Sequence, residues 1–200
     1  MTELKKIIAT LSLSITALLV VFVLQYNTGA KTTEEAMTIA GLSTLETLYE
    51  KKTEEGTILL YRVPGEEQLS LAFLNRHFSG YEYVDSAIQH ETSSLEEQAG
   101  ITYVTLRQSD DIPYTIYAGV TTNPDLVEVL VTEPTFSIAH SAKVFESNVK
   151  GVYIWMAYSP DFTGESFSLI GLSESGKILG DLEHNGTELT IHSLDTSQAQ

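Results

Sequence analysis

An apolar run near the N-terminus constrains this chain more than any other feature of its sequence. Residues 7–24 contain no charge, no proline and no glycine, and two lysines, Lys5 and Lys6, come directly before them. At a rise of about 1.5 Å per residue, a helix over this run is about 27 Å long, close to the roughly 30 Å hydrocarbon core of a bilayer. Because a lone segment in lipid pairs all its backbone groups only as a helix, the run predicts one membrane-spanning helix.

The flanking lysines predict the orientation, since cytoplasmic flanks of membrane segments carry the excess of Lys and Arg. We therefore expect a single-pass protein of the cell membrane with a cytoplasmic N-terminus and an extracellular C-terminal domain. The small residues Thr28, Gly29 and Ala30 also fit a signal-peptidase site, and cleavage there would give a secreted protein. The run exceeds the roughly 7–15 residue core of a secretory signal, which favours a retained anchor.

The charge and the cysteine content exclude several function classes. The chain has 11 Lys and Arg against 27 Asp and Glu, a formal net charge of −16. Only Glu3, Lys5 and Lys6 precede the apolar run, so the remainder has nine basic and 26 acidic residues and a net charge of −17. Such a body repels polyanions, so neither nucleic acid nor anionic lipid is an expected partner. Because there is no cysteine, disulfides, thiolate metal sites, cysteine nucleophiles and a lipidated cysteine are excluded.

The remaining length, about 170 residues, is typical of one domain. We divide the chain into an anchor or signal segment (1–26), a short linker (27–33), one extracytoplasmic domain (34–193) and a polar tail (194–200). The expected fold class is α+β: the N-terminal membrane helix, then one amphipathic helix and a mainly antiparallel, β-rich domain.

Local patterns predict the elements of this domain. Thr32 with Glu35 three residues later forms a capping-box pattern, and helical spacing of Met37, Leu45 and Leu48 extends the predicted helix to about Lys52. Alternation and turn signals then predict strands over residues 57–63, 69–74, 81–88, 101–107, 114–120, 126–132, 136–144, 152–158, 167–172 and 177–182. The segment 69–74 also fits a helix, and residues 90–100 are predicted as a polar loop.

The apolar segment 152–158 is predicted to be a central strand that is covered on both faces. Its residues Tyr153 and Trp155 point to the same face. Such a pair could stack on a sugar ring. Since the residues between and around them are also apolar, we favour a packed core for both side chains.

A hairpin is predicted at Asn185-Gly186, the strongest short signal for a two-residue turn. This turn would place Glu183 opposite Glu188, with Asp181 close by. The three carboxylates Asp181, Glu183 and Glu188 are therefore a candidate cation site. A solvent-screened face is the favoured alternative, because hard-cation sites usually add backbone carbonyls from bent loops.

Several stretches carry a resemblance to a known group of proteins. They are YAGVTTNPDLVEVLV (117–131), then AHSAKVF, VYIWMAY and LIGLSESGKIL. In these stretches the chain resembles small exported domains of Gram-positive bacteria, which are typically anchored by one helix or by a lipidated cysteine. The likeness covers roughly residues 57–180 and implies a β-rich extracytoplasmic domain, with no catalytic residues to carry over. The absence of cysteine separates this chain from the lipidated members.

Motifs for catalysis are scarce, and we assign no catalytic or cofactor-binding residue. Ser147 and Lys150 match the Ser-x-x-Lys spacing of acyl-enzyme hydrolases, but that spacing between predicted strands does not bring the two side chains together. His140 falls on the apolar face of its strand, where a core histidine is expected. The acids occur mostly as adjacent pairs, and no pair stands out as a catalytic acid and base.

Two function classes remain. The favoured one is a non-enzymatic binding or accessory module of the cell envelope. It would be held by the membrane through residues 7–24 and would bind an envelope protein or a wall component. The alternative is a cell-wall hydrolase that works through carboxylates.

Overall fold

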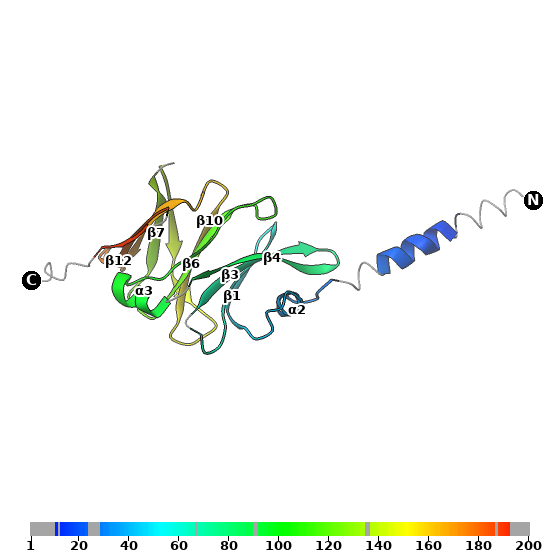
Figure 1. Ribbon diagram of the computed structural model, residues 1–200, viewed down its shortest axis with the longest axis horizontal. Coiled ribbons are helices and arrows are strands. Elements are labelled where there is room, and N and C mark those ends of the chain that lie inside the picture. Colours follow the sequence, from blue (N-terminus) through cyan, green and yellow to red (C-terminus); the bar gives the residue numbers. More distant parts are fainter. Residues whose placement is uncertain are drawn as a thin grey trace, which may run out of the picture.

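The chain is mainly β, with three antiparallel sheets and a few short helices (Figure 1). The computed structural model describes residues 11, 13–23, 29–66, 68–89, 92–134, 137–186 and 188–192, without the side chains of 92, 93 and 138. Residues 13–23 are helical, and α2 (Thr33–Ile39) and α3 (Thr92–Ala99) are short. The predicted antiparallel, β-rich domain is confirmed. The predicted tail 194–200 lies outside the described residues.

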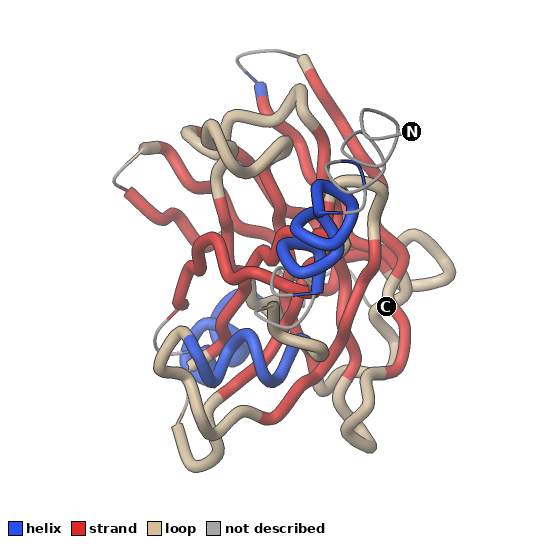
Figure 2. The backbone as a smooth tube through the Cα atoms, turned by 90° about the vertical axis from the view of Figure 1, so that its right-hand side faces the viewer, coloured by secondary structure: helices blue, strands red, loops and turns tan. Residues whose placement is uncertain are grey.

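Strands account for most of the body (Figure 2). The first sheet has the order β1 (Glu46–Lys52), β2 (Gly56–Arg62), β3 (Leu69–His77) and β4 (Gly80–Gln89). The middle sheet has the order β5 (Val104–Leu106), β6 (Thr115–Thr121), β10 (Tyr153–Ser159) and β9 (Phe145–Glu146). The third sheet has the order β13 (Glu188–Ile191), β12 (Ile178–Asn185), β11 (Ser166–Leu172), β7 (Glu128–Glu133) and β8 (Ile138–Lys143).

The three sheets form layers, with the middle sheet covered on both faces. One apolar cluster joins the first and middle sheets, and includes Ile58, Phe73 and Ile116. A second joins the middle and third sheets and includes Trp155 and Leu169. A third cluster lies under α2, on the other face of β2 and β3. The prediction that residues 152–158 form a central strand is therefore confirmed.

The alternation of β10 explains how one strand serves two cores. Ile154 belongs to the cluster shared with the first sheet, whereas Trp155 belongs to the cluster shared with the third sheet. Trp155 is 0% exposed, as the core interpretation predicted, whereas Tyr153 is partly exposed. The direct cross-strand partner of Trp155 is Gly119, whose missing side chain leaves room for the indole.

The predicted amphipathic helix begins as expected but ends much earlier. The Thr32 side chain accepts a hydrogen bond from the backbone N–H of Glu35 at 3.1 Å, which caps α2. The helix ends at Ile39. Gly41 follows with a φ of 92°, and the Leu42 N–H donates to the Met37 carbonyl at 2.9 Å. This is a Schellman ending, in which glycine takes a left-handed conformation that other residues rarely adopt. The extension of the helix to Lys52 is therefore wrong.

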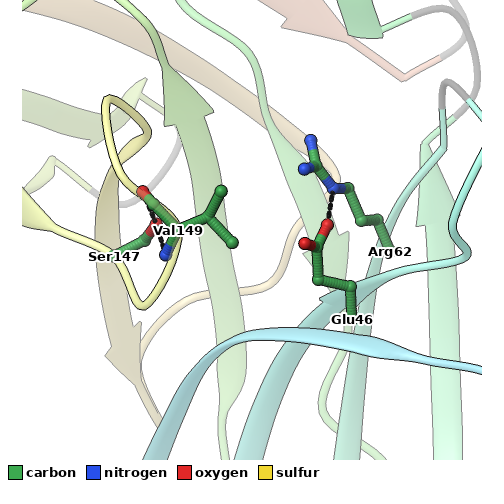
Figure 3. A network of polar contacts seen from close by, with 4 residues as sticks. All are labelled: Glu46, Arg62, Ser147 and Val149. Carbon is green, nitrogen blue, oxygen red and sulfur yellow. Dashed lines mark hydrogen bonds and ion pairs between the residues drawn. The ribbon is translucent and has the colours of Figure 1, made fainter.

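The residues beyond Gly41 form β1 instead, because they pair with β2. Glu46 lies opposite Arg62 in this ladder, and the Arg62 Nε donates to the Glu46 carboxylate (Figure 3). Both side chains are more than a third exposed, so this ion pair contributes at most about 1 kcal/mol. Backbone pairing and the burial of Leu48, which is 1% exposed, are the larger reasons for the strand.

A second correction concerns the predicted loop at 90–100, which contains α3. Two sets of contacts hold this helix on the sheets, one at Glu96 and one at Ala99. Glu96 accepts hydrogen bonds from the Thr121 and Thr122 hydroxyls at 3.1 and 3.0 Å. At its end, Ala99 is 0% exposed and packs closely on Gly180 of the third sheet. Tertiary contacts thus stabilise a helix too short to be stable alone.

The described part of the apolar run consists of residues 11 and 13–23, and Figure 1 shows it as a helix that projects from the sheets. Among the described residues, no helix is both long enough and apolar enough to cross a membrane. Residues 7–10, 12 and 24 of the run lie outside the described residues.

Candidate functional site

The region that best qualifies as a functional site is the corner where the N-terminal segment meets the first sheet. We call it the N-terminal corner and define it as residues 29–31, α2 and the tip of the β3–β4 hairpin, residues 76–81. Two cavities lie in it, of about 460 and 250 Å³.

The predicted linker, 27–33, is packed onto the domain over its described residues. Ala30 is 3% exposed and forms an antiparallel bridge with Tyr81. In this bridge the Tyr81 N–H donates to the Ala30 carbonyl at 2.8 Å. The Lys31 ammonium donates to the Ser79 carbonyl at 3.0 Å. These contacts tie the linker to β4 at the edge of the first sheet through one isolated bridge.

Glycine makes this close approach possible. Gly80 has a φ of 139°, and a Cβ there would collide with the Ala30 carbonyl. A Cβ on Gly29 would likewise collide with the Ser79 carbonyl. The backbones of the linker and the hairpin tip therefore lie closer together than side chains would allow.

The larger cavity lies between α2 and β4. Its walls combine apolar and polar groups, with Ala36 and Ile39 from α2 and Tyr81 and Tyr83 from β4. Ile39 is 72% exposed. The cavity is open to solvent, and an exposed isoleucine beside tyrosines suits contact with a macromolecule better than enclosure of a small substrate.

The smaller cavity gathers positive charge. It is lined by Lys31, Arg76 and His77, together with Phe78 and Tyr81. Phe78 is 61% exposed. The His77 Nε2 lies 3.1 Å from a carboxylate oxygen of Glu82.

The hairpin tip also contacts the N-terminal helix. The rings of Phe22 and Phe78 are stacked, with centroids 5.7 Å apart and planes inclined by 16°. Phe22 lies at the end of the apolar run that is nearest to the domain. The N-terminal corner is therefore continuous with the helical segment.

A buried carboxylate, Glu133, lies far from this corner at the end of β7. It is 0% exposed and accepts hydrogen bonds from the Tyr117 hydroxyl at 2.5 Å and from the Gly164 N–H at 2.8 Å. It also accepts from the backbone N–H of Thr163 at 2.9 Å and from its hydroxyl at 3.0 Å. Burial, followed by this carboxylate, raises the pKa of Tyr117 far above its ordinary range.

Glu133 therefore anchors the loop between β10 and β11. Both carboxylate oxygens are occupied by donors from the protein itself, and no face of the side chain is open. A catalytic acid or base must reach the substrate proton within hydrogen-bonding distance. In this structure both oxygens of Glu133 accept hydrogen bonds that hold this loop in place.

The candidate cation site rests on a register that the structure does not have. Glu183 lies opposite Thr190, and Glu188 lies opposite Asn185. The ladder thus includes Asn185 instead of leaving it in the turn, and Gly186 takes the positive φ of 66°. Two-residue hairpin turns can have glycine at the first central position, instead of asparagine and glycine at the two central positions.

This shift of the turn by one residue separates the two glutamates. Leu182 is buried on the inner face. Glu183 and Glu188 are diagonal rather than direct neighbours, and Glu183 has His192 at 3.9 Å. Asp181 lies on the same outer face, and its carbonyl accepts from the His192 N–H. Within the described ranges, three or more potential ligands of the His, Cys, Asp and Glu types do not cluster anywhere.

The Ser-x-x-Lys match at Ser147 is a turn. Its hydroxyl donates to the Val149 carbonyl and accepts from the Val149 N–H, both at 3.0 Å (Figure 3). Lys150 is exposed at the end of this turn. The hydroxyl is thus engaged in the local hydrogen bonds that serine commonly forms in turns.

His140 does lie in register with the buried Val131 on β7, but it is exposed. Its ring meets Phe162 edge to face, with centroids 4.7 Å apart. The prediction of a core histidine is therefore wrong, because β8 is the edge strand of the third sheet. A side chain on the inward face of an edge strand has neighbouring strands on one side only, so it stays partly open to solvent.

Sequence reasoning missed both the hairpin tip and Glu133. The tip carries no motif, and its partners Phe22 and Ala30 are about fifty residues away in the chain. Glu133 could have been found, because it follows Val129 and Val131 in phase on one strand face. An acid in that phase signals a buried, hydrogen-bonded carboxylate.

Comparison of the chain with protein-family models, with curated proteins and with solved structures found no match.

Proposed function

We propose that this protein is a membrane-anchored, extracytoplasmic module of the cell envelope with a binding or accessory role rather than an enzymatic one. In this proposal residues 7–24 cross the membrane once. The N-terminus is cytoplasmic, and the three-sheet body lies outside. Its partner is an envelope protein or a wall component.

One observation carries the proposal: the helical residues near the N-terminus expose apolar side chains all around the helix. The large ones are between 50% and 73% exposed, namely Leu11, Leu13, Ile15, Leu18, Leu19, Val20, Val21, Phe22 and Val23. A helix that is apolar on every side is stable only inside a core or in lipid. The sheets leave these side chains uncovered, so lipid is the environment that suits them.

The packing of the linker supports a retained anchor over a cleaved signal. Cleavage after Ala30 would remove the acceptor of the Tyr81 N–H and a side chain that is 3% exposed. A mature chain beginning at Lys31 would thus lose its bridge to the edge of the first sheet. Signal-peptidase sites normally precede the folded body.

The state of the carboxylates supports a non-enzymatic role. Among the described residues Glu133 has the fully buried carboxylate, and its oxygens accept hydrogen bonds from backbone and hydroxyl donors. A glycosidase needs two carboxyl groups that flank an open cleft and have different environments. The hydrolase alternative therefore has less support. The resemblance to small exported domains agrees with an envelope module.

Fractionation of cells that express the full chain tests the anchor. We expect the chain to sediment with membranes at its full mass, and its C-terminus to be digested by protease added to cells without a wall. A variant that lacks residues 1–28 should remain in the supernatant. A C-terminus protected from outside protease would overturn the orientation, and a mass that lacks the first 30 residues would overturn the retained anchor.

A second experiment tests the role of the body. Chemical crosslinking in intact cells, followed by purification of the full chain, should recover the same envelope protein or wall fragment with the wild type and with a Glu133→Gln variant at permissive temperature. Turnover of isolated wall polymers by the purified protein would instead favour the hydrolase.

A further inference from the structure

The tip of the β3–β4 hairpin combines exposed positive charge with an exposed aromatic ring. Lys31 and Arg76 are two of the nine basic residues that follow the apolar run, and they line one cavity of about 250 Å³ together with His77. Phe78, at the tip itself, is 61% exposed. Two cationic side chains and a histidine thus lie at one cavity, although the body as a whole is strongly acidic.

The position of this tip relative to the helix is fixed by two contacts. The Phe78 ring stacks on Phe22, which is two residues from the end of the apolar run. The bridge between Ala30 and Tyr81 then ties the chain that follows the helix to the same hairpin. If residues 7–24 span the membrane, these contacts place the tip at the boundary between hydrocarbon and lipid head groups on the outer side.

We propose that the hairpin tip is a second membrane contact. Phe78 inserts at the interface of the outer leaflet, and Arg76 and Lys31 bind the phosphate of a phospholipid head group. This inference rests on the proposed anchor. Aromatic side chains favour this depth of the bilayer, and the planar guanidinium of arginine matches the oxygens of a phosphate.

The acidic charge of the body does not oppose such a contact. At physiological salt, charges are screened over about 8 Å, so a lipid phosphate at the tip experiences its immediate neighbours. Those neighbours are the three basic side chains, with Glu82 facing His77 at 3.1 Å and Glu35 accepting from the backbone N–H of Lys31 at 2.5 Å. The contact would hold the body in one orientation on the membrane, with the middle and third sheets farther out.

The absence of cysteine makes a site-specific test possible. Single cysteines are placed in the full chain by Val21→Cys in the helix, Ser79→Cys at the tip and Glu174→Cys in the turn after β11. Each is labelled with a fluorophore, and the proteins are inserted into phosphatidylcholine nanodiscs with nitroxide groups near the head groups. The fraction of fluorescence that is quenched reports the proximity of each position to the lipid.

We expect strong quenching at positions 21 and 79 and only background quenching at 174. Reversal of one charge by Arg76→Glu should weaken quenching at position 79, because the reversed side chain repels the lipid phosphate, whereas the matched reversal Lys177→Glu, in the turn before β12, should leave quenching at 79 unchanged. Discs with added anionic lipid should give quenching at 79 at least as strong.

Three results would overturn the inference, and they are distinguishable. Quenching at 21 with background quenching at 79 would leave the anchor standing and refute the second contact. Background quenching at 21 would refute the anchor and the second contact with it. Equal loss of quenching with Arg76→Glu and Lys177→Glu would refute the role of the tip charges.

Discussion

Trp155 and Gly119 are direct cross-strand partners in the middle sheet, and the indole and the Thr102 carbonyl together occupy the space that a side chain on Gly119 would need. We expect Gly119→Ala to lower the free energy of unfolding by about 3 kcal/mol, because overpacking at a fixed backbone forces neighbouring groups apart. Denaturant titration followed by the fluorescence of the single tryptophan measures this loss.

A turn glycine provides the control for this prediction. Gly176 has a φ of 78° and open space around it. Gly176→Ala should therefore cost only the roughly 1 kcal/mol of a left-handed alanine. Equal costs at the two positions would show that lack of space for a side chain is not the reason for glycine at 119.

We expect Glu133→Gln to destabilise the fold by about 3 kcal/mol, because an amide nitrogen would face backbone donors in a buried site. Glu133 accepts from Thr163 and Gly164 in the loop before β11. Glu165→Gln, which changes an exposed residue of the same loop, should have an effect within experimental error. A stable Glu133→Gln protein would show that the carboxylate does not anchor this loop.

Alkaline pH should destabilise the protein through Tyr117. Burial raises the pKa of its hydroxyl above the ordinary value of 10.0, so the folded state keeps the proton after the unfolded state has lost it. The stabilising effect is complete below about pH 10 and is lost as the pH rises further, at about 1.4 kcal/mol per pH unit for one group. Unfolding between about pH 9 and 11 should show a steeper loss for the wild type than for Tyr117→Phe. Equal slopes would contradict the prediction.

The linker bridge predicts a local effect of Gly80. Gly80→Ala should separate Ala30 from the hairpin, because a Cβ there collides with the Ala30 carbonyl. Hydrogen exchange at the Tyr81 N–H should become about tenfold faster or more, since local opening would no longer be opposed by the bridge. Gly65→Ala, at a φ of 85° but with open space, should leave this amide unchanged.

The register of the β12–β13 hairpin predicts which cysteines can pair. Glu183→Cys with Thr190→Cys joins direct cross-strand partners, whose Cα atoms are about 5.5 Å apart, within disulfide range. Glu183→Cys with Glu188→Cys joins diagonal positions about 7–8 Å apart. Oxidation followed by mass spectrometry should find a disulfide in the first pair and free thiols in the second. The reverse outcome would restore the Asn185-Gly186 turn.

Features that depend on neighbouring residues in the chain could be predicted from the sequence. The start of α2 at Thr32 follows from a side-chain oxygen three residues before Glu35. The strands follow from alternation, and the segment 152–158 is apolar in both phases, as a strand between two cores must be. These signals are local because caps and the two strand faces are properties of a few consecutive residues.

Features that depend on partners far away in the chain could not be predicted from the sequence. The stripe that includes Leu45 and Leu48 fits a helix or a strand, and pairing with β2 selects the strand. Residues 92–99 have little periodicity, and docking on Gly180 makes them helical. Two registers of the β12–β13 hairpin would place the same side chains on the inner face. The observed register occurs with β12 also paired to β11.

By itself the sequence determined the apolar segment, the β-rich body and its acidic charge, because these are sums over residue types or patterns within short windows. Only the tertiary structure brought Phe78 to Phe22 and Ala30 to Tyr81 and gathered Lys31 and Arg76 at one cavity. A net charge averages over the whole surface, whereas recognition depends on the few groups within a screening length of each other. Which groups those are is decided by the pairing of strands and by the close approach that Gly29 and Gly80 allow.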